Sequence, residues 1–229
     1  MGSVPATGLV NESVTELHDY NELRSETSPL MLVVQVDRPV LVLGSSQSTD
    51  ILDAGRLGET PTRRRRGGGG LVLLQPGDLW VDWWIPASDD RWSDDVHVGS
   101  QRAGAWWKAA LAPLVAGAIS IHGGALEGDP AYRLVCFAGA GPGEVFVDGR
   151  KAVGVTQWRV REGMFLSSAL LTHGSGAIPS YLRVVPDGLE TELNHHTMAT
   201  LGILDGQGLI QSLRDASSPS TYRPIELAL

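Results

Sequence analysis

The sequence predicts an α+β fold in which helices flank a mixed, largely antiparallel sheet. Strand-like apolar segments outnumber helical segments along the chain. The pair Asp148-Gly149 is a strong hairpin-turn signal, so the segments on either side of it should be adjacent antiparallel strands. Apolar residues at helical spacing, such as Ala103, Trp107 and Leu111, indicate a helix between strands. This combination of elements is typical of α+β proteins.

The first half of the chain carries a polar segment and then several predicted strands. Residues 1–26 are polar and weakly periodic, so we expect a partly helical segment whose first residues are frayed. Residues 30–36 and 40–44 are apolar runs split by an Asp-Arg-Pro sequence, and both are predicted to be strands. Strands are also predicted at residues 71–74 and 79–85. The last of these contains tryptophans, which suit a pleated, half-buried surface.

The second half carries helices and the remaining strands. A solvated acidic loop at residues 88–95 precedes a helix predicted at 100–112, which Pro113 should end. A late helix is predicted at residues 206–217. Strands are predicted, in order, at residues 132–137, 144–147, 152–158 and 164–171.

Length and composition indicate one large domain with short appendages. The 229 residues are 42% hydrophobic and 19% charged, which is ordinary for a globular protein able to bury a sizeable core. We expect an N-terminal segment at residues 1–26 and a main domain at 27–205. Residues 206–229 should form a helix and tail packed on that same domain.

Charge, cysteine content and hydropathy exclude several classes of protein. The net charge of −8 argues against a nucleic-acid binder, because neutralising phosphates requires a positive surface. The single cysteine, Cys136, rules out an intramolecular disulfide framework. Residues 1–16 lack the basic and apolar regions of a signal peptide, and no apolar run approaches the ~20 residues of a membrane helix. We therefore expect a cytoplasmic protein without a membrane span.

A run of arginines and glycines is the first candidate for binding chemistry. Arginines at 63–66 and glycines at 67–70 lead directly into an apolar strand. Glycines let a backbone approach a ligand closely and expose its N–H groups, and arginine can clamp a carboxylate or phosphate. We interpret the run as an anion-binding loop. A flexible linker and a basic address tag are the alternatives.

Lys151 and Cys136 are the candidate reactive side chains. Lys151 follows the Asp148-Gly149 turn and offers a movable positive charge, although most such lysines are solvated hairpin residues. Cys136 lies in an apolar run, where cysteine is usually a small buried hydrophobe. As a nucleophile it would need electropositive surroundings that favour the thiolate. The separation from Lys151, 151 − 136 = 15 residues, places the two on neighbouring predicted strands.

Four segments occur in the order found in one enzyme superfamily. Residues 38–47 (RPVLVLGSSQ) resemble its early strand segment, and residues 64–72 (RRRGGGGLV) resemble its arginine–glycine loop. Residues 76–79 (PGDL) occupy a short step after that loop, and residues 149–159 (GRKAVGVTQWR) are similar to its lysine loop. Over residues 34–171 the chain thus resembles the catalytic domain of lipoate–protein ligase A, octanoyltransferases and biotin ligases.

The resemblance implies a class II synthetase-like, or biotin-ligase-like, α/β sandwich. In that domain the glycine loop and lysine loop enclose a tunnel for lipoate or octanoate. Lys151 is implied to contact the acyl carboxyl group or an adenylate phosphate. Site residues implied for acyl or adenylate binding are Arg64, Arg65, Gly68, Gly69, Gly70, Gly149, Gly154, Gln157 and Arg159. No metal ligand is assigned among the residues of the chain.

The resemblance also implies a reaction. A lipoate–protein ligase-like enzyme would activate lipoate or octanoate with ATP and Mg²⁺ to an acyl-adenylate. It would then attach the acyl group to a lysine of the lipoyl carrier domain of a 2-oxoacid dehydrogenase or glycine cleavage protein. Many such ligases carry a further C-terminal domain used in activation, so we expect that an accessory chain could take part.

Three other functions remain open from the sequence. One octanoyltransferase branch resembles this chain in placing a cysteine and phenylalanine, here Cys136-Phe137, before the lysine loop. Such an enzyme would take octanoyl from an acyl carrier protein through a thioester and need no ATP. The second alternative function is that of a catalytically degenerate protein that binds lipoate or the carrier. It is suggested by three departures from the family pattern: the family has serine, His-Asp and His-Gly where this chain has Gly67, Leu74-Gln75 and Ser167-Ser168. A biotin ligase is the third alternative, and residues 63–70 match the usual GRGRxG pattern of that family poorly.

Overall fold

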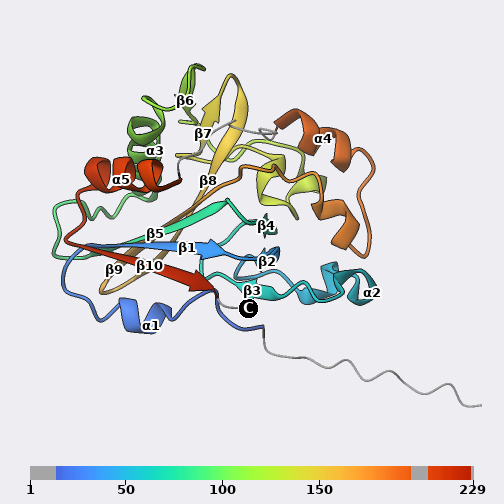
Figure 1. The fold of residues 1–229 in the computed structure, drawn as a ribbon, viewed down its shortest axis with the longest axis horizontal. Helices are drawn as coiled ribbons and strands as arrows, with labels where there is room; N and C mark the ends of the chain where they lie inside the picture. The colour runs from blue at the N-terminus through green and yellow to red at the C-terminus, as the bar shows by residue number, and fades with distance from the viewer. Residues whose placement is uncertain (1–13, 197–205, 228–229) are drawn as a thin grey trace, which may run out of the picture.

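The computed structural model describes residues 14–196 and 206–227, which form two sheets and flanking helices (Figure 1). The main sheet has the strand order β10-β1-β5-β9-β8-β7-β6, parallel between β1 and β10 and antiparallel elsewhere. Its strands are β1 (Leu30–Val36), β5 (Leu79–Pro86), β6 (Ile119–Ile121), β7 (Val145–Val147), β8 (Arg150–Val160), β9 (Gly163–Leu170) and β10 (Thr221–Leu227). The predicted mixed, largely antiparallel sheet is confirmed.

A smaller sheet and the helices complete the layers. The small sheet has the order β3-β2-β4, in which β2 pairs parallel with β3 and antiparallel with β4. Its strands are β2 (Val40–Leu43), β3 (Thr62–Arg64) and β4 (Val72–Leu74). The helices are α1 (Tyr20–Leu23), α2 (Ala54–Leu57), α3 (Val96–Leu111), α4 (Leu189–His196) and α5 (Gly206–Ser217). Short 3-10 turns are η1 (Thr49–Ile51), η2 (Pro130–Tyr132), η3 (Cys136–Ala138) and η4 (Ile178–Tyr181).

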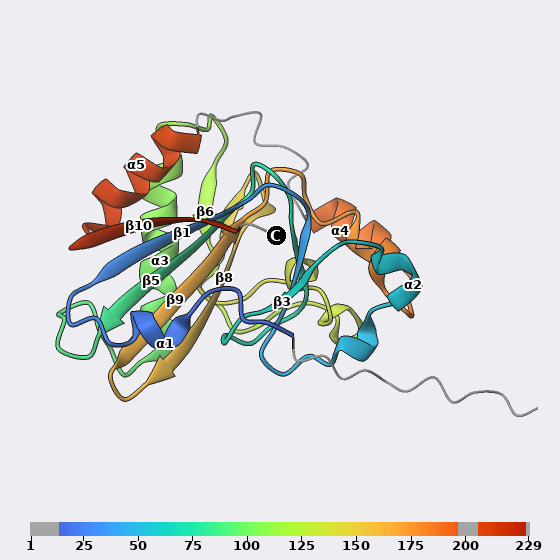
Figure 2. The ribbon, with the colours of Figure 1, turned by 60° about the horizontal axis from the view of Figure 1, so that its bottom comes forward.

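The central strands β1, β5 and β9 of the main sheet are almost entirely buried, and the sheet lies between the helices α3 and α5 and the small sheet (Figure 2). In β1, Met31 and Val33 point to the helical layer of α3 and α5, whereas Leu32 and Val34 point to the small sheet. This alternation follows from the two-residue period of a strand. The small sheet has its own outer core, in which α4 and η4 cover the far side of β2 and β4. Within residues 14–196 and 206–227, no helix is long and apolar enough to cross a membrane.

Helix α3 forms because a capped, amphipathic segment meets the sheet. The Asp95 carboxylate accepts a hydrogen bond from the His97 N–H at 2.7 Å and so begins the helix four residues before the predicted start. Ala103, Trp107 and Leu111 lie on the buried face, as their spacing predicts. The helix ends at Leu111, before Pro113, as the sequence predicts.

The strand predicted at residues 132–137 is wrong. The segment forms the 3-10 turns η2 and η3 instead, with Pro130 in the first turn of η2 and Asp129 as its N-cap. Only one isolated bridge, from Val135 to Leu71, pairs this segment with a neighbouring chain segment. Val135 and Phe137 are buried, whereas Tyr132, Leu134 and Cys136 are half-buried, so the turn produces an apolar pattern similar to that of a strand. The consequence is that Cys136 lies on a turn and not on a strand beside Lys151.

The C-terminal segment joins the main domain more closely than predicted. Helix α5 has the predicted bounds, and Leu209, Ile210 and Leu213 pack against α3 and the sheet. The following residues, predicted as a tail, form the strand β10, which contains Pro224. Proline is tolerated there because β10 is an edge strand.

Candidate active site

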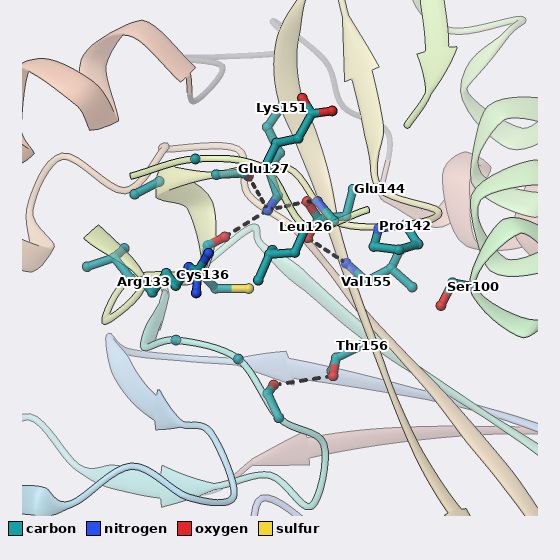
Figure 3. A pocket seen from close by; sticks show the side chains of 18 of the residues that line it. Ser100, Leu126, Glu127, Arg133, Cys136, Pro142, Glu144, Lys151, Val155 and Thr156 are labelled. Carbon is teal, nitrogen blue, oxygen red and sulfur yellow. Dashed lines mark hydrogen bonds and ion pairs between the residues drawn. The ribbon is translucent and has the colours of Figure 1, made fainter. Parts of the chain in front are cut away.

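One cavity of about 740 Å³ lies where the glycine loop, η3, the β7–β8 hairpin and the first turn of α3 meet (Figure 3). The wall combines residues far apart in the sequence. Those already singled out from the sequence are Gly68, Gly69, Gly70, Cys136, Lys151 and Gln157. The wall also includes residues that the sequence did not single out, among them Val96, Ser100, Leu126, Glu144 and Thr156.

The buried side chain of Arg65 holds the glycine loop in its conformation. Its side chain is 1% exposed, and its guanidinium donates to the carbonyls of Gly68 at 2.8 Å, Gly70 at 2.7 Å and Val42 at 3.2 Å. Burial lowers the pKa of Arg65, and Coulombic interactions with the neighbouring Cys136, Tyr20 and Asp82 oppose that shift. Arg65 is therefore a buried cation beside the thiol, held in place by the loop whose shape it fixes.

The loop glycines are required by close packing. A Cβ at Gly70 would lie 2.6 Å from the backbone N of Cys136, and Gly69 has φ +93°, which favours glycine. Among the described residues, no acceptor takes a hydrogen bond from the N–H groups of Gly68, Gly69 or Gly70. All three glycines line the pocket, so their N–H groups are candidate donors to a ligand.

Lys151 is a buried cation with three acceptors. Its side chain is 1% exposed, and Nζ lies 2.6 Å from the Glu144 carboxylate, 2.7 Å from the Cys136 carbonyl and 3.0 Å from the Gly139 carbonyl. Nζ also lies 4.9 Å from the centroid of the Phe137 ring. Two of the acceptors belong to the η3 turn and the residue after it, so Lys151 holds that turn in place (Figure 3).

Glu144 is a site residue that sequence reasoning missed. Its carboxylate also accepts the Gly141 N–H at 2.6 Å and the Val155 N–H at 3.4 Å, so the fold fixes it from two directions. Burial raises the pKa of Glu144, and the Lys151 ammonium opposes this shift. The available signal was a carboxylate seven residues before Lys151, across the hairpin turn.

The Cys136 thiol lies at the centre of this arrangement. In Figure 3 its sulfur points into the pocket. The Cys136 N–H donates to the Leu71 carbonyl at 3.0 Å, which ties η3 to the strand after the glycine loop. Its Sγ lies 3.9 Å from the Cβ position built at Gly69 and 3.7 Å from that at Gly154, so loop and hairpin enclose the thiol. Glycine loop, thiol and Lys151 thus share one pocket.

Arg64, Gly149 and Gly154 lie outside the wall of the cavity. Arg64 donates to the carbonyls of Gly44 at 2.8 Å and Gln47 at 2.7 Å, which braces the loop after β2. Gly149 forms the hairpin turn with φ +76° and faces open space. Gly154 lies behind Cys136. Their predicted contacts with a ligand stay predictions.

Gln157 and Arg159 link β8 to α3. The Gln157 amide donates to the Val96 carbonyl at 2.6 Å and the Ser100 hydroxyl at 2.8 Å. Arg159 donates to the Gln157 amide oxygen at 2.7 Å and to the Asp95 carbonyl at 3.1 Å. Gln157 therefore lines the pocket, whereas Arg159 orients it from outside.

Two departures from the superfamily pattern have structural reasons. A Cβ at Gly67 would lie 2.8 Å from the Thr156 methyl group, so a serine there would require the Thr156 side chain to move. The Thr156 hydroxyl in turn donates a hydrogen bond to the Gly68 carbonyl at 3.2 Å, which connects the glycine loop to β8. Ser168 accepts the Trp107 indole N–H at 2.8 Å and thereby joins the sheet to α3.

The pocket wall carries more acidic than basic groups. Its charged side chains are Arg133 and Lys151 against Glu127, Asp129 and Glu144, with His97 beside them. In the described part of the chain, no group of three or more His, Cys, Asp or Glu side chains could hold a metal ion.

The arrangement of layers is that of a known class of domain, the catalytic domain of lipoate–protein ligases. A Thermoplasma acidophilum protein described as a lipoate protein ligase, with bound lipoic acid, is 14% identical, with TM-score 0.65 over 91% of this chain and 81% of that one. Lipoate-protein ligase A bound with ATP is 15% identical, with TM-score 0.63 over 87% of this chain and 76% of that one. A bipartite lipoate protein ligase of Thermoplasma acidophilum, from a structural study with its E2 lipoyl domain, is 14% identical, with TM-score 0.62 over 90% of this chain and 78% of that one.

This chain therefore has the fold of the lipoate–protein ligases, the superfamily that its motifs resemble. The sequence matches no protein-family model. It also matches no curated protein.

Proposed function

We propose that this protein transfers a medium-chain acyl group, octanoyl or lipoyl, to a lysine of a lipoyl carrier domain through a thioester on Cys136. The observation that carries the proposal is the position of the Cys136 thiol between the unpaired N–H groups of the glycine loop and the Lys151 hairpin. Neighbours of the same fold, one with bound lipoic acid and one studied with its lipoyl domain, support the acyl group and the partner.

The proposed reaction has two steps. The Cys136 thiolate attacks the carbonyl carbon of an acyl thioester, a new C–S bond forms, and the donor thiol leaves with the proton that Cys136 has lost. The carrier lysine, as a neutral amine, then attacks the Cys136 thioester. An amide forms, the Cys136 thiolate leaves, and the amine gives up its extra proton to solvent. No oxidant, reductant or nucleotide is consumed.

The residues around Cys136 have roles in both steps. Each attack places negative charge on the acyl oxygen, and the free N–H groups of Gly68, Gly69 and Gly70 are the donors able to stabilise it. Arg65 holds the glycine loop that carries these N–H groups through its hydrogen bonds to the carbonyls of Gly68 and Gly70. Lys151 keeps the turn that carries Cys136 in position through the Cys136 carbonyl.

An ATP-dependent ligase that forms an acyl-adenylate is the second candidate. The lipoate-protein ligase A structure with bound ATP favours it. A nucleotide triphosphate needs cations or Mg²⁺ around its phosphates. The pocket offers Arg133 and an already paired Lys151 against three carboxylates, so the described residues fit this cofactor poorly. An accessory chain would have to supply the missing charge.

Intact-mass spectrometry of a purified lipoyl domain tests the proposal. One reaction contains octanoyl-acyl carrier protein without ATP, and the other contains octanoate or lipoate with ATP and Mg²⁺. Acylation in the first reaction supports the thioester route. Acylation only in the second would favour the ligase, and no acylation in either would favour a binding protein without catalysis.

A further inference from the structure

We infer that Glu144 determines which acyl donors the pocket accepts, favouring electrically neutral esters, thioesters and amides over free carboxylates. The inference rests on the proposed function, because it assumes that the pocket beside Cys136 holds the acyl group. It assigns a specificity role to a residue that takes no part in bond making.

Lys151 has no hydrogen-bond donor left for an anion. A lysine ammonium carries three N–H donors. The three acceptors around Nζ are the Glu144 carboxylate at 2.6 Å and the carbonyls of Cys136 and Gly139 at 2.7 and 3.0 Å. A free carboxylate could reach Nζ only by displacing one of these acceptors.

The arginines of the glycine loop are engaged as well. Arg64 donates to backbone carbonyls of the loop after β2, and Arg65 donates to the carbonyls of Gly68 and Gly70. Both cations therefore shape the pocket without presenting charge to its interior. Arg133 is the remaining basic side chain among the described wall residues.

Glu144 cannot easily leave the pair. It is 4% exposed, and the Gly141 and Val155 N–H groups hold its carboxylate independently of Lys151. A second carboxylate beside Lys151 would face this fixed charge at short range, and like charges in one buried site disfavour double ionisation. The carbonyl oxygen of a neutral donor needs only N–H donors, which Gly68 to Gly70 supply.

The test compares two unreactive probes of the same shape, octanoate and octanamide, by titration calorimetry. We expect the wild-type protein to bind octanamide at least about tenfold more tightly than octanoate, because only octanoate meets a like charge. In Glu144→Gln the Lys151 charge has no counterion. In this variant we expect octanoate to bind more tightly, so that the ratio of octanamide affinity to octanoate affinity falls at least about tenfold.

Two further variants keep the test decisive. The double variant Glu144→Gln/Lys151→Met removes both charges of this buried pair, so it should fold even where the single variant does not, and it should again prefer octanamide. Glu16→Gln breaks an ion pair outside the pocket, between Glu16 and Arg66 at 2.6 Å, and should leave the ratio unchanged. Equal affinity of wild-type protein for both probes, with transfer to the carrier intact, would overturn this inference alone. Failure to bind either probe, together with no transfer, would overturn the proposed function.

Discussion

Among single residues, Lys151 connects the turn that carries Cys136 to the rest of the pocket. Its ammonium bridges the Glu144 carboxylate and the carbonyls of the first residue of η3 and of the residue after it. A lysine at a hairpin is ordinarily solvated, yet this one is 1% exposed because its neighbours replace water completely. The charge of Lys151 is therefore needed both to place Cys136 and to compensate Glu144.

Replacing Lys151 with alanine should abolish acyl transfer and destabilise the fold. The variant loses the contact to the Cys136 carbonyl and leaves Glu144 buried without a cation, which costs about 3–5 kcal/mol. Urea unfolding measures the stability, and carrier-domain mass measures transfer. Lys108→Ala, at an exposed position of α3, is the control and should change stability by less than about 0.5 kcal/mol. Wild-type transfer by Lys151→Ala would remove this residue from the site.

At the scale of elements, the glycine loop and η3 form one unit. Hydrogen bonds from Arg65 and Thr156 hold the loop. The Leu71 backbone, directly after the loop, donates to the Leu134 carbonyl and accepts from the Cys136 N–H. The distance between the loop N–H groups and the thiol is therefore set by backbone packing at Gly70, where the two segments touch.

Gly70→Ala should separate these two segments. A Cβ at this position meets backbone atoms of Arg133, Val135 and Cys136 at 2.6–2.7 Å, so the turn must move. Overpacking of this kind costs about 1–3 kcal/mol, and we expect transfer to fall at least about tenfold. Gly68→Ala is the matched control for stability, because a Cβ there meets nothing within 4 Å. Equal melting temperatures for the two variants would show that the contact at Gly70 is not tight.

Arg91 joins two other elements, the loop after β5 and the end of α5. Its guanidinium pairs with Asp89 at 2.7 and 2.9 Å and donates to the Ser217 and Ser218 carbonyls at 2.8 and 3.0 Å. Arg91→Ala should lower the free energy of unfolding by about 1–2 kcal/mol at pH 7. Arg161→Ala, whose side chain is 95% exposed, should have little effect.

The effect of Arg91 should depend on pH. Hydrogen bonds from Arg91 lower the pKa of Asp89 below its ordinary value of 3.8. A carboxylate with a lowered folded-state pKa stabilises the fold above the ordinary value and loses that contribution as the pH falls through the lowered value. The difference in unfolding free energy between wild type and Arg91→Ala should therefore shrink below about pH 4. A difference that grows in acid would contradict this assignment.

At the scale of the whole molecule, the pocket lies between the two sheets. The small sheet contributes the glycine loop, and the main sheet contributes the β7–β8 hairpin and, through its helical layer, α3 (Figures 1 and 2). β10 forms the opposite edge of the main sheet, beside β1, and α5 packs against α3 in the helical layer. We therefore expect the C-terminal segment to support stability without contacting the acyl group.

Much of this architecture could be predicted from the sequence, and the failures have physical causes. Alternating or continuous apolar runs located β1, β5, β8 and β9 because burial on a sheet imposes a short period. The same rule failed at residues 132–137, since a partly buried turn presents an apolar pattern similar to that of a strand. Within the site, the motifs located Lys151 and the glycine loop. Glu144 and the fit of Gly67 to Thr156 depend on tertiary contacts between segments distant in sequence or across a hairpin.

The most direct test of the central claim is the intact mass of the protein itself after mixing with octanoyl-acyl carrier protein, without carrier domain and without ATP. The account predicts an increase by one octanoyl group that hydroxylamine removes. The adduct should be absent from Cys136→Ala, and Cys136→Ser should fold while losing transfer, because an alcohol is the weaker nucleophile. An unmodified wild-type protein that still acylates the carrier domain, or full turnover by Cys136→Ser, would contradict the thioester route.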